Sequence, residues 1–168
     1  MEVRAARPIA AAPEAIFAFL ANPDRHWQLL GRRLEPLRAY DGERSQVRLH
    51  GPLGIRRTLW IRLAAERPPH ELVGRVEAGR GATIGSVRWT VRPATDGSSV
   101  VELTARTELA APLDRLLLAA GGARWLRQSL ERALAALDLT LTRGGRGDSA
   151  CLAEQAQPGA RDRRAEGP

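Results

Sequence analysis

The feature that most constrains this chain is a long stretch of period-two alternation, from Leu34 to Leu109, divided by turn signals at regular intervals. Val87, Trp89 and Val91 alternate with polar neighbours, which is typical of a strand with one buried face. Short loops between consecutive strands favour antiparallel pairing. The pattern predicts a meander of six strands, at residues 34–40, 44–50, 55–66, 70–78, 82–93 and 98–109.

Two kinds of element precede this meander. Residues 2–10 alternate apolar and polar positions and predict a seventh strand. Pro13 then suits the first turn of a short helix, because that position needs no backbone N–H donor. A second short helix is predicted from Asn22 to Leu30, and Gly31 ends it.

A long helix is predicted after the last strand, beginning at Pro112. Its leucines recur at the spacing of an apolar stripe as far as Leu141. Gly121 and Gly122 interrupt the stripe and predict a bend, because each glycine costs about 1 kcal/mol in a helix interior. Residues 142–168 are polar and rich in Arg and Gly, so we expect a disordered tail. The predicted fold is therefore one α+β domain over residues 1–141, with a curved antiparallel sheet and a long C-terminal helix.

Composition narrows the possible settings and partners. No stretch approaches the roughly 20 apolar residues that a membrane-spanning helix needs, the N-terminus lacks a secretion-signal pattern, and Cys151 is the only cysteine. A cytoplasmic protein is therefore expected. All 26 basic residues are arginine, and the formal net charge is +7. Because these arginines are scattered among acidic residues, with no recognisable DNA-binding motif, nucleic acid is not the expected partner.

The order of elements resembles a known family. Residues 8–17 (PIAAAPEAIF) and 22–27 (NPDRHW) resemble the first strand and two short helices of the START-like, or SRPBCC, superfamily. Residues 87–91 (VRWTV) resemble its penultimate strand, and residues 126–141 its last helix. The closest resemblance is to the polyketide cyclase/dehydrase and lipid-transport group. It implies a helix-grip fold, in which the sheet curls around the last helix and leaves an apolar cavity between them.

The resemblance also implies candidate site residues. Polyketide aromatase/cyclases of this kind line the pocket with tryptophans, an arginine and a tyrosine. Trp27, Trp60 and Trp89 fall where such aromatics are expected, but the arginine position falls on Ala64, and the tyrosine position falls near Arg33 or Leu34. Arg62 is the nearest substitute for the missing arginine, and it is the only catalytic candidate. Trp60 and Arg62 could equally lie on the outer face of the sheet.

Three functions remain open. The first is binding or transport of an apolar small molecule such as a lipid or polyketide. The second is a cyclase or dehydrase acting on a polyketide, and the third is an interaction module with a filled core. For the first, the predicted ligand-binding residues are Trp27, Trp60, Arg62, Leu72, Val76, Val87, Trp89, Leu103, Leu117 and Trp125.

Other chemistry has no support in the pattern. His26, His50 and His70 fall on separate elements without the paired spacing of a metal site, so no metal is expected. The sequence contains no nucleophile elbow, P-loop or dinucleotide fingerprint, so no cofactor is expected either.

Overall fold

The computed structural model describes residues 1–22, 25, 29, 31–38, 44–51 and 54–155. Seven strands form one antiparallel sheet, with the spatial order β1-β7-β6-β5-β4-β3-β2. The strands are β1 (Glu2–Ile9), β2 (Leu34–Arg38), β3 (Ser45–His50), β4 (Arg56–Arg67), β5 (Glu71–Ala78), β6 (Thr83–Pro93) and β7 (Ser99–Leu109). Every predicted strand begins within one residue of the observed start. The predicted meander is thus confirmed, and β1 adds a seventh strand by pairing with β7.

The helices lie at the two ends of the chain. They are α1 (Pro13–Leu20), the 3₁₀ turn η1 (Gly31–Arg33), α3 (Pro112–Leu117), the wide turn η3 (Leu118–Gly122) and α4 (Ala123–Gln155). The predicted second short helix falls on a segment of which only Asn22, Arg25 and Leu29 are among the described residues. Helix α4 continues past residue 141, where the predicted domain ends, and the boundary there stays a prediction.

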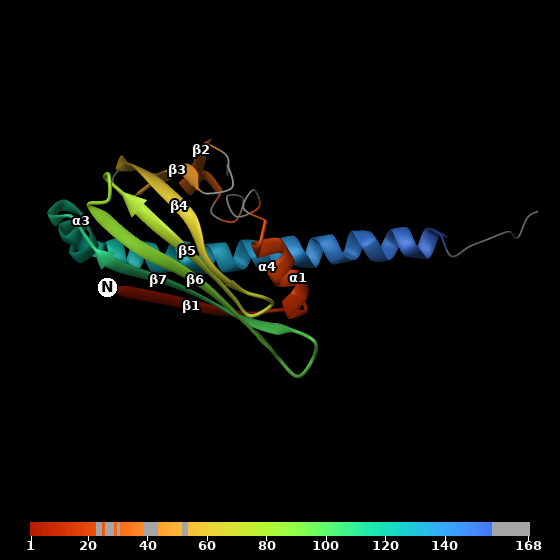
Figure 1. Ribbon diagram of the computed structural model, residues 1–168. Coiled ribbons are helices and arrows are strands. Elements are labelled where there is room, and N and C mark those ends of the chain that lie inside the picture. Colours follow the sequence, from red (N-terminus) through yellow and green to blue (C-terminus); the bar gives the residue numbers. More distant parts are fainter. Residues whose placement is uncertain (23–24, 26–28, 30, 39–43, 52–53, 156–168) are drawn as a thin grey trace, which may run out of the picture.

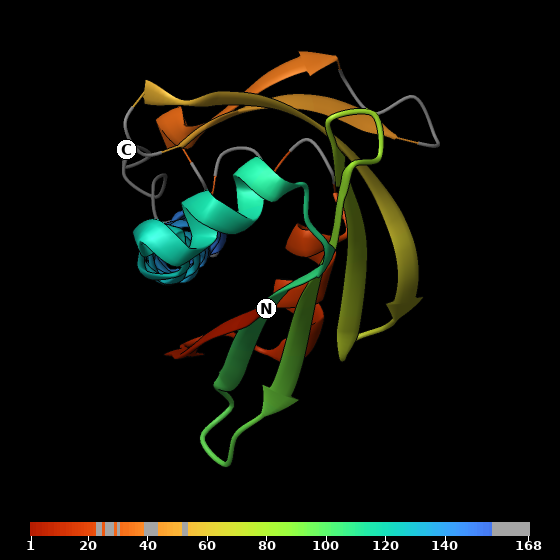
Figure 2. The same ribbon diagram turned by 90° about the vertical axis from the view of Figure 1, so that its left-hand side faces the viewer.

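The sheet curves around the first part of α4. Figure 1 shows α4 running along the concave side of the sheet, and Figure 2, turned by 90°, shows the strands arching over it. Helix α4 packs against β1 and β7, whereas α1 packs against β5 and β6. The α+β fold with a curved antiparallel sheet and a long C-terminal helix is the one expected from the sequence.

One continuous core fills the space where α1 and α4 meet β1, β6 and β7. Leu130, Leu134 and Leu137 recur at helical spacing on α4 and are all buried, as the apolar stripe predicts. From the sheet, Val91 and Val101 are cross-strand partners and are almost completely buried. Helix and sheet therefore bury their apolar faces against each other.

The predicted bend in the last helix is confirmed. Ala120 (φ −78°, ψ 23°) and Gly121 (φ 107°) depart from helical geometry between α3 and α4. The backbone at Gly121 lies in the left-handed region, which glycine adopts without a steric penalty. At Gly122, a Cβ atom would lie only 2.7 Å from the carbonyl oxygen of Leu117. Both glycines are therefore needed where the chain changes direction from α3 to α4.

Candidate functional site

A cavity of about 340 Å³ lies between the sheet and α4. Strands β3 to β7 form one wall, and Trp125, Leu126 and Ala133 of α4 contribute to the other. The wall is mostly aliphatic and aromatic. The volume of the cavity lies near the lower end of the range of roughly 300–1,000 Å³ that is typical of small-molecule sites.

Small residues on the wall account for part of this space. Gly74, Ala78, Gly85 and Ala105 line the cavity from three neighbouring strands, where larger side chains would otherwise meet the helix. Gly85 lies at a register shift between β6 and β7. A Cβ atom there would come within 2.6 Å of the carbonyl oxygen of Arg106. The bulge therefore requires glycine, and its lack of a side chain leaves the cavity open at this point.

Seven of the predicted ligand-binding residues line the cavity. Besides Arg62, which is described below, they are Leu72, Val76, Val87, Trp89, Leu103 and Trp125. Five of these six come from inward positions of β5, β6 and β7, and Leu72, Trp89 and Leu103 are cross-strand partners in one row. Their place on the wall follows from the alternation in the sequence, while their contact with a ligand stays a prediction.

Two other predicted residues do not line the cavity, and these placements need correction. Trp60 pairs with Gln46 and Glu77 on the outer face of the sheet, where the guanidinium of Arg44 lies 4.5 Å from its ring centroid. Leu117 is half-buried at the end of α3, ahead of the break in the helix, and is not part of the wall. Trp27 lies outside the described residues.

Arg62, the only catalytic candidate, borders the cavity, but its side chain lies on the outer face of the sheet. It alternates with Ile61, whose side chain lines the cavity, and it pairs with Arg75 on the outer face of the sheet. The residue is exposed. Its carbonyl oxygen is 3.8 Å from the position of a Cβ atom at Gly74. Arg62 therefore borders the cavity with its main chain, and its guanidinium faces solvent.

A different arginine supplies a charge on the cavity wall. Arg33, the last residue of η1, donates a short hydrogen bond from Nη1 to Oγ of Ser129, and its guanidinium lies 5.1 Å from the ring centroid of Trp125. All three residues line the cavity. Desolvation lowers the pKa of the Arg33 guanidinium, and the positive charge of Arg132 lowers it further. The family resemblance placed a pocket tyrosine near Arg33 or Leu34, but it indicated no role for the Arg33 guanidinium.

Polar contacts fix α3 at one end of the cavity. Asp114 of α3 accepts hydrogen bonds from Nη2 of Arg57 on β4 and, at 2.5 Å, from the hydroxyl of Thr83 on β6. The Thr83 hydroxyl in turn accepts a bond of 3.1 Å from the backbone N–H of Ala111. Because Thr83 also lines the cavity, this network joins α3 to two strands beside the ligand space.

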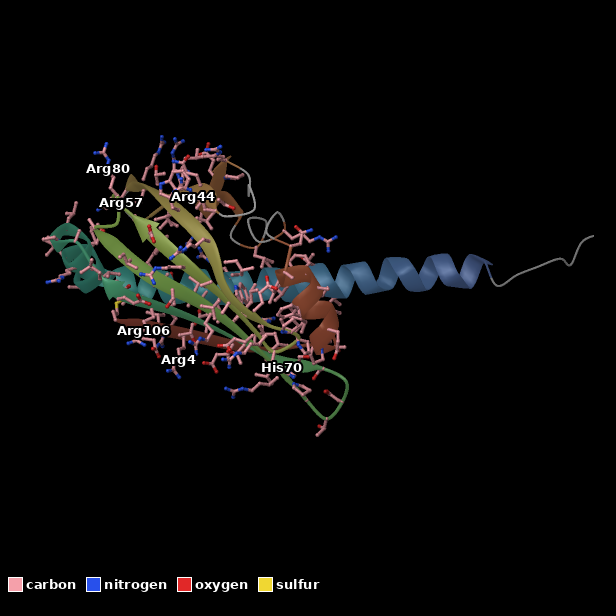
Figure 3. The ribbon with its side chains drawn as sticks, in the orientation of Figure 1. Arg4, Arg44, Arg57, His70, Arg80 and Arg106 are labelled. Atoms are coloured by element: carbon pink, nitrogen blue, oxygen red, sulfur yellow. The ribbon has the colours of Figure 1, made fainter. Side chains whose placement is uncertain are left out.

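Other ion pairs lie on the convex face of the sheet. Arg88 pairs with Glu71 at 3.2 Å and Arg92 with Glu102 at 3.9 Å, all on strands. Figure 3 shows labelled basic side chains on both the upper and the lower side of the sheet, coming from several elements. Exposed pairs of this kind contribute little stability individually, about 0–1 kcal/mol. Their distribution resembles a solvated surface more than a single basic patch.

Comparison with known proteins shows the family of this chain. Residues 1–142 match the family described as polyketide cyclase / dehydrase and lipid transport. The chain belongs to this family. No curated protein matches the sequence. The polyketide cyclase/dehydrase and lipid-transport family thus accounts for the whole sheet and for the part of α4 that packs against it.

Solved structures with the same fold come from several bacteria. The protein TTHA0849 of Thermus thermophilus is 22% identical, with a TM-score of 0.64 over 86% of this chain and 99% of that one. Ms6760 of Mycobacterium smegmatis is 16% identical, with a TM-score of 0.61 over 85% and 92% of the two chains. DR_A0006 of Deinococcus radiodurans is 21% identical, with a TM-score of 0.57 over 83% and 99%. At these identities the likeness shows the fold alone.

Two further observations concern the described residues. None of their helices combines the length and apolarity needed to cross a membrane. In the same part of the chain, no cluster of three or more His, Cys, Asp or Glu side chains is arranged to hold a metal ion.

Proposed function

We propose that this protein binds an apolar small molecule, such as a lipid or a polyketide-like compound, in the cavity between the sheet and α4. The observation that carries the proposal is the cavity itself, which has about 340 Å³ of space and a wall made mostly of apolar side chains. Burial of apolar surface supplies the affinity for such a ligand, at about 25 cal/mol per Å² before the cost of immobilising it. The few polar groups on the wall would set its orientation.

The two alternatives have less support. A cyclase or dehydrase needs a group that polarises a carbonyl or moves a proton, and its candidate was Arg62. That side chain lies on the face of the sheet opposite Ile61, away from the ligand space. An interaction module with a filled core would leave no cavity of this size. Binding or carriage therefore fits the geometry best, and the lipid or polyketide class of the ligand rests on the family.

A thermal-shift screen tests the proposal directly. The wild-type protein is heated alone and with fatty acids, sterols and aromatic polyketides, and at least one class is expected to raise the unfolding temperature, because a ligand that binds only the native state stabilises it. Val76→Trp, which places a large ring on the cavity wall, should lose most of that shift. A folded protein that none of these ligands stabilises would contradict the proposal.

A further inference from the structure

We infer that the cavity recognises an apolar ligand that carries a carboxylate, and that Arg33, held by Ser129 and Trp125, binds this head group. The inference rests on the proposed function and adds to it the charge and polarity of the ligand. The family resemblance placed a tyrosine position near Arg33, and no sequence pattern indicated a carboxylate ligand.

Ser129 and Trp125 hold the Arg33 guanidinium in place. Its Nη1 donates to Ser129 Oγ, and the Ser129 hydroxyl donates onward to the carbonyl oxygen of Trp125 at 2.8 Å. The serine is buried, with 3% of its surface exposed. The Trp125 ring supports the guanidinium from another side, at 5.1 Å. An arginine fixed by a buried hydroxyl and an aromatic ring is preorganised, so less conformational entropy is lost when it binds an anion.

Arg33 has no acidic partner among the described residues. Within the described part of the chain, no carboxylate forms an ion pair with Arg33, although eight other arginines have acidic partners. A guanidinium has five N–H donors, and the bond to Ser129 uses one of them. Arg132 is exposed and is not part of the wall, but its positive charge is close enough to lower the pKa of Arg33. A cation on a mostly apolar wall, with a second positive charge nearby, favours an anion.

The charged Arg33 guanidinium contrasts with the rest of the cavity wall, which is mostly apolar. Elsewhere on the wall, β4, β5 and β6 present Leu59, Ile61, Val76, Ile84 and Val87. A ligand that satisfies both sides has a charged oxygen head and a hydrocarbon body. The planar guanidinium fork matches a carboxylate with two parallel hydrogen bonds, which an alcohol cannot reproduce.

The cavity volume sets the approximate length of the probe. If each non-hydrogen atom takes about the ~30 Å³ that one water molecule occupies in the liquid, the cavity holds on the order of eleven of them. Decanoate is close to this size. Its alcohol, 1-decanol, has the same hydrocarbon tail without the charge, and decyltrimethylammonium has the same tail with the opposite charge.

The experiment titrates these three probes into the full-length protein, below their micelle-forming concentrations, and follows heat release by calorimetry. The variants are Arg33→Gln, Arg33→Lys and the matched control Arg92→Gln, which removes an exposed arginine on the outer face of β6 that is not part of the cavity wall. Wild type should bind decanoate about tenfold or more tighter than decanol, because hydrogen bonds to charged groups are the stronger class. Decyltrimethylammonium should bind most weakly.

Arg33→Gln should lose about tenfold or more in decanoate affinity while binding decanol within about twofold of wild type. Retained decanol binding shows that this variant is folded with its cavity intact. Arg33→Lys should recover part of the decanoate affinity, since it restores the charge without the planar fork. Arg92→Gln should behave as wild type throughout.

Two results would overturn the inference alone: decanol binding wild type as tightly as decanoate, or Arg33→Gln binding decanoate as tightly as wild type. In both cases the cavity would still bind apolar ligands, so the proposed function would stand. Failure of wild type to bind any of the three probes would overturn both the inference and the proposed function for ligands of decanoate's size.

Discussion

The two halves of the sheet face α4 in different ways. In the closed half, where β1 and β7 meet α4, side chains such as Val101 and Leu134 are at most 1% exposed. In the open half, formed by β3, β4 and β5, inward residues such as Leu59 and Val76 are only half-buried around the cavity. Both halves obey the same period-two alternation. The comparison shows that alternation decides which face a side chain occupies, whereas the opposing element decides whether that face is packed or left open for a ligand.

Truncating one leucine in each half should show the difference between the two halves most clearly. Leu134→Ala removes a fully buried side chain and should lower the free energy of unfolding by about 2–5 kcal/mol, because it leaves a void in a packed core. Leu59→Ala enlarges a space that already exists and should cost only about 1 kcal/mol. Chemical denaturation of both variants measures the difference. Equal losses would mean that the open half is packed as tightly as the closed one.

Enlarging a valine in each half tests the same contrast in the opposite direction. Val101→Phe forces extra volume into the packed core and should cost about 1–3 kcal/mol. Val76→Phe projects into the cavity, where there is room, and should change the free energy of unfolding by less than about 1 kcal/mol. Thermal and urea unfolding report the outcome. If Val76→Phe were the more destabilising of the two, the space beside Val76 would not be there.

Two glycines on the cavity wall give a finer comparison. Gly85→Ala should cost about 1–3 kcal/mol, because the new Cβ atom would lie 2.6 Å from the carbonyl oxygen of Arg106 and the bulge would have to shift. The nearest atoms to a Cβ atom at Gly74 are 3.8 Å away, which is ordinary contact. Gly74→Ala should therefore be neutral or stabilise by up to about 1 kcal/mol. The pair is read from denaturant midpoints, and a tolerated alanine at position 85 would contradict the bulge geometry.

The smallest effect on stability is expected at Glu35 on β2, the edge strand beside the open half. The pKa of Glu35 is lowered by its hydrogen bond to His50 at 3.3 Å and by the charge of Arg48. A lowered folded-state pKa means that the stabilisation is present above the unfolded pKa and disappears as the pH falls through the folded value. Glu35→Gln should therefore unfold slightly earlier than wild type at neutral pH and match it in acid. Glu66→Gln, on β4, is the control, and a difference that grew on acidification would contradict the assignment.

Much of the fold was predictable from local patterns. Alternation placed Val87, Trp89 and Leu103 on the inner face, and glycine content located the break at Gly121. These features follow from neighbouring residues alone. The position of the family match, over residues 1–142, agrees with the resemblance seen in the order of elements.

The parts of the candidate site that escaped prediction depend on distant contacts. Trp60 is apolar enough to face inward, and its outward placement is set by pairing with the neighbouring strands and by the stacking of Arg44. Leu117 follows the apolar stripe, but the break after it turns α3 away from the cavity wall. Arg33 has no motif around it, and its role depends on Ser129, 96 residues further along the chain. Sequence periodicity carries no information about such a pair.

The most direct test of the central claim, that the open half is a ligand site and the closed half a core, is methyl NMR during a decanoate titration. We expect progressive, saturable shift changes for the methyl groups of Leu59, Ile61 and Val76, with much smaller changes for Val101 and Leu134. If the methyl groups of the open half did not respond while binding was detected calorimetrically, the ligand would lie elsewhere and the claim would be wrong.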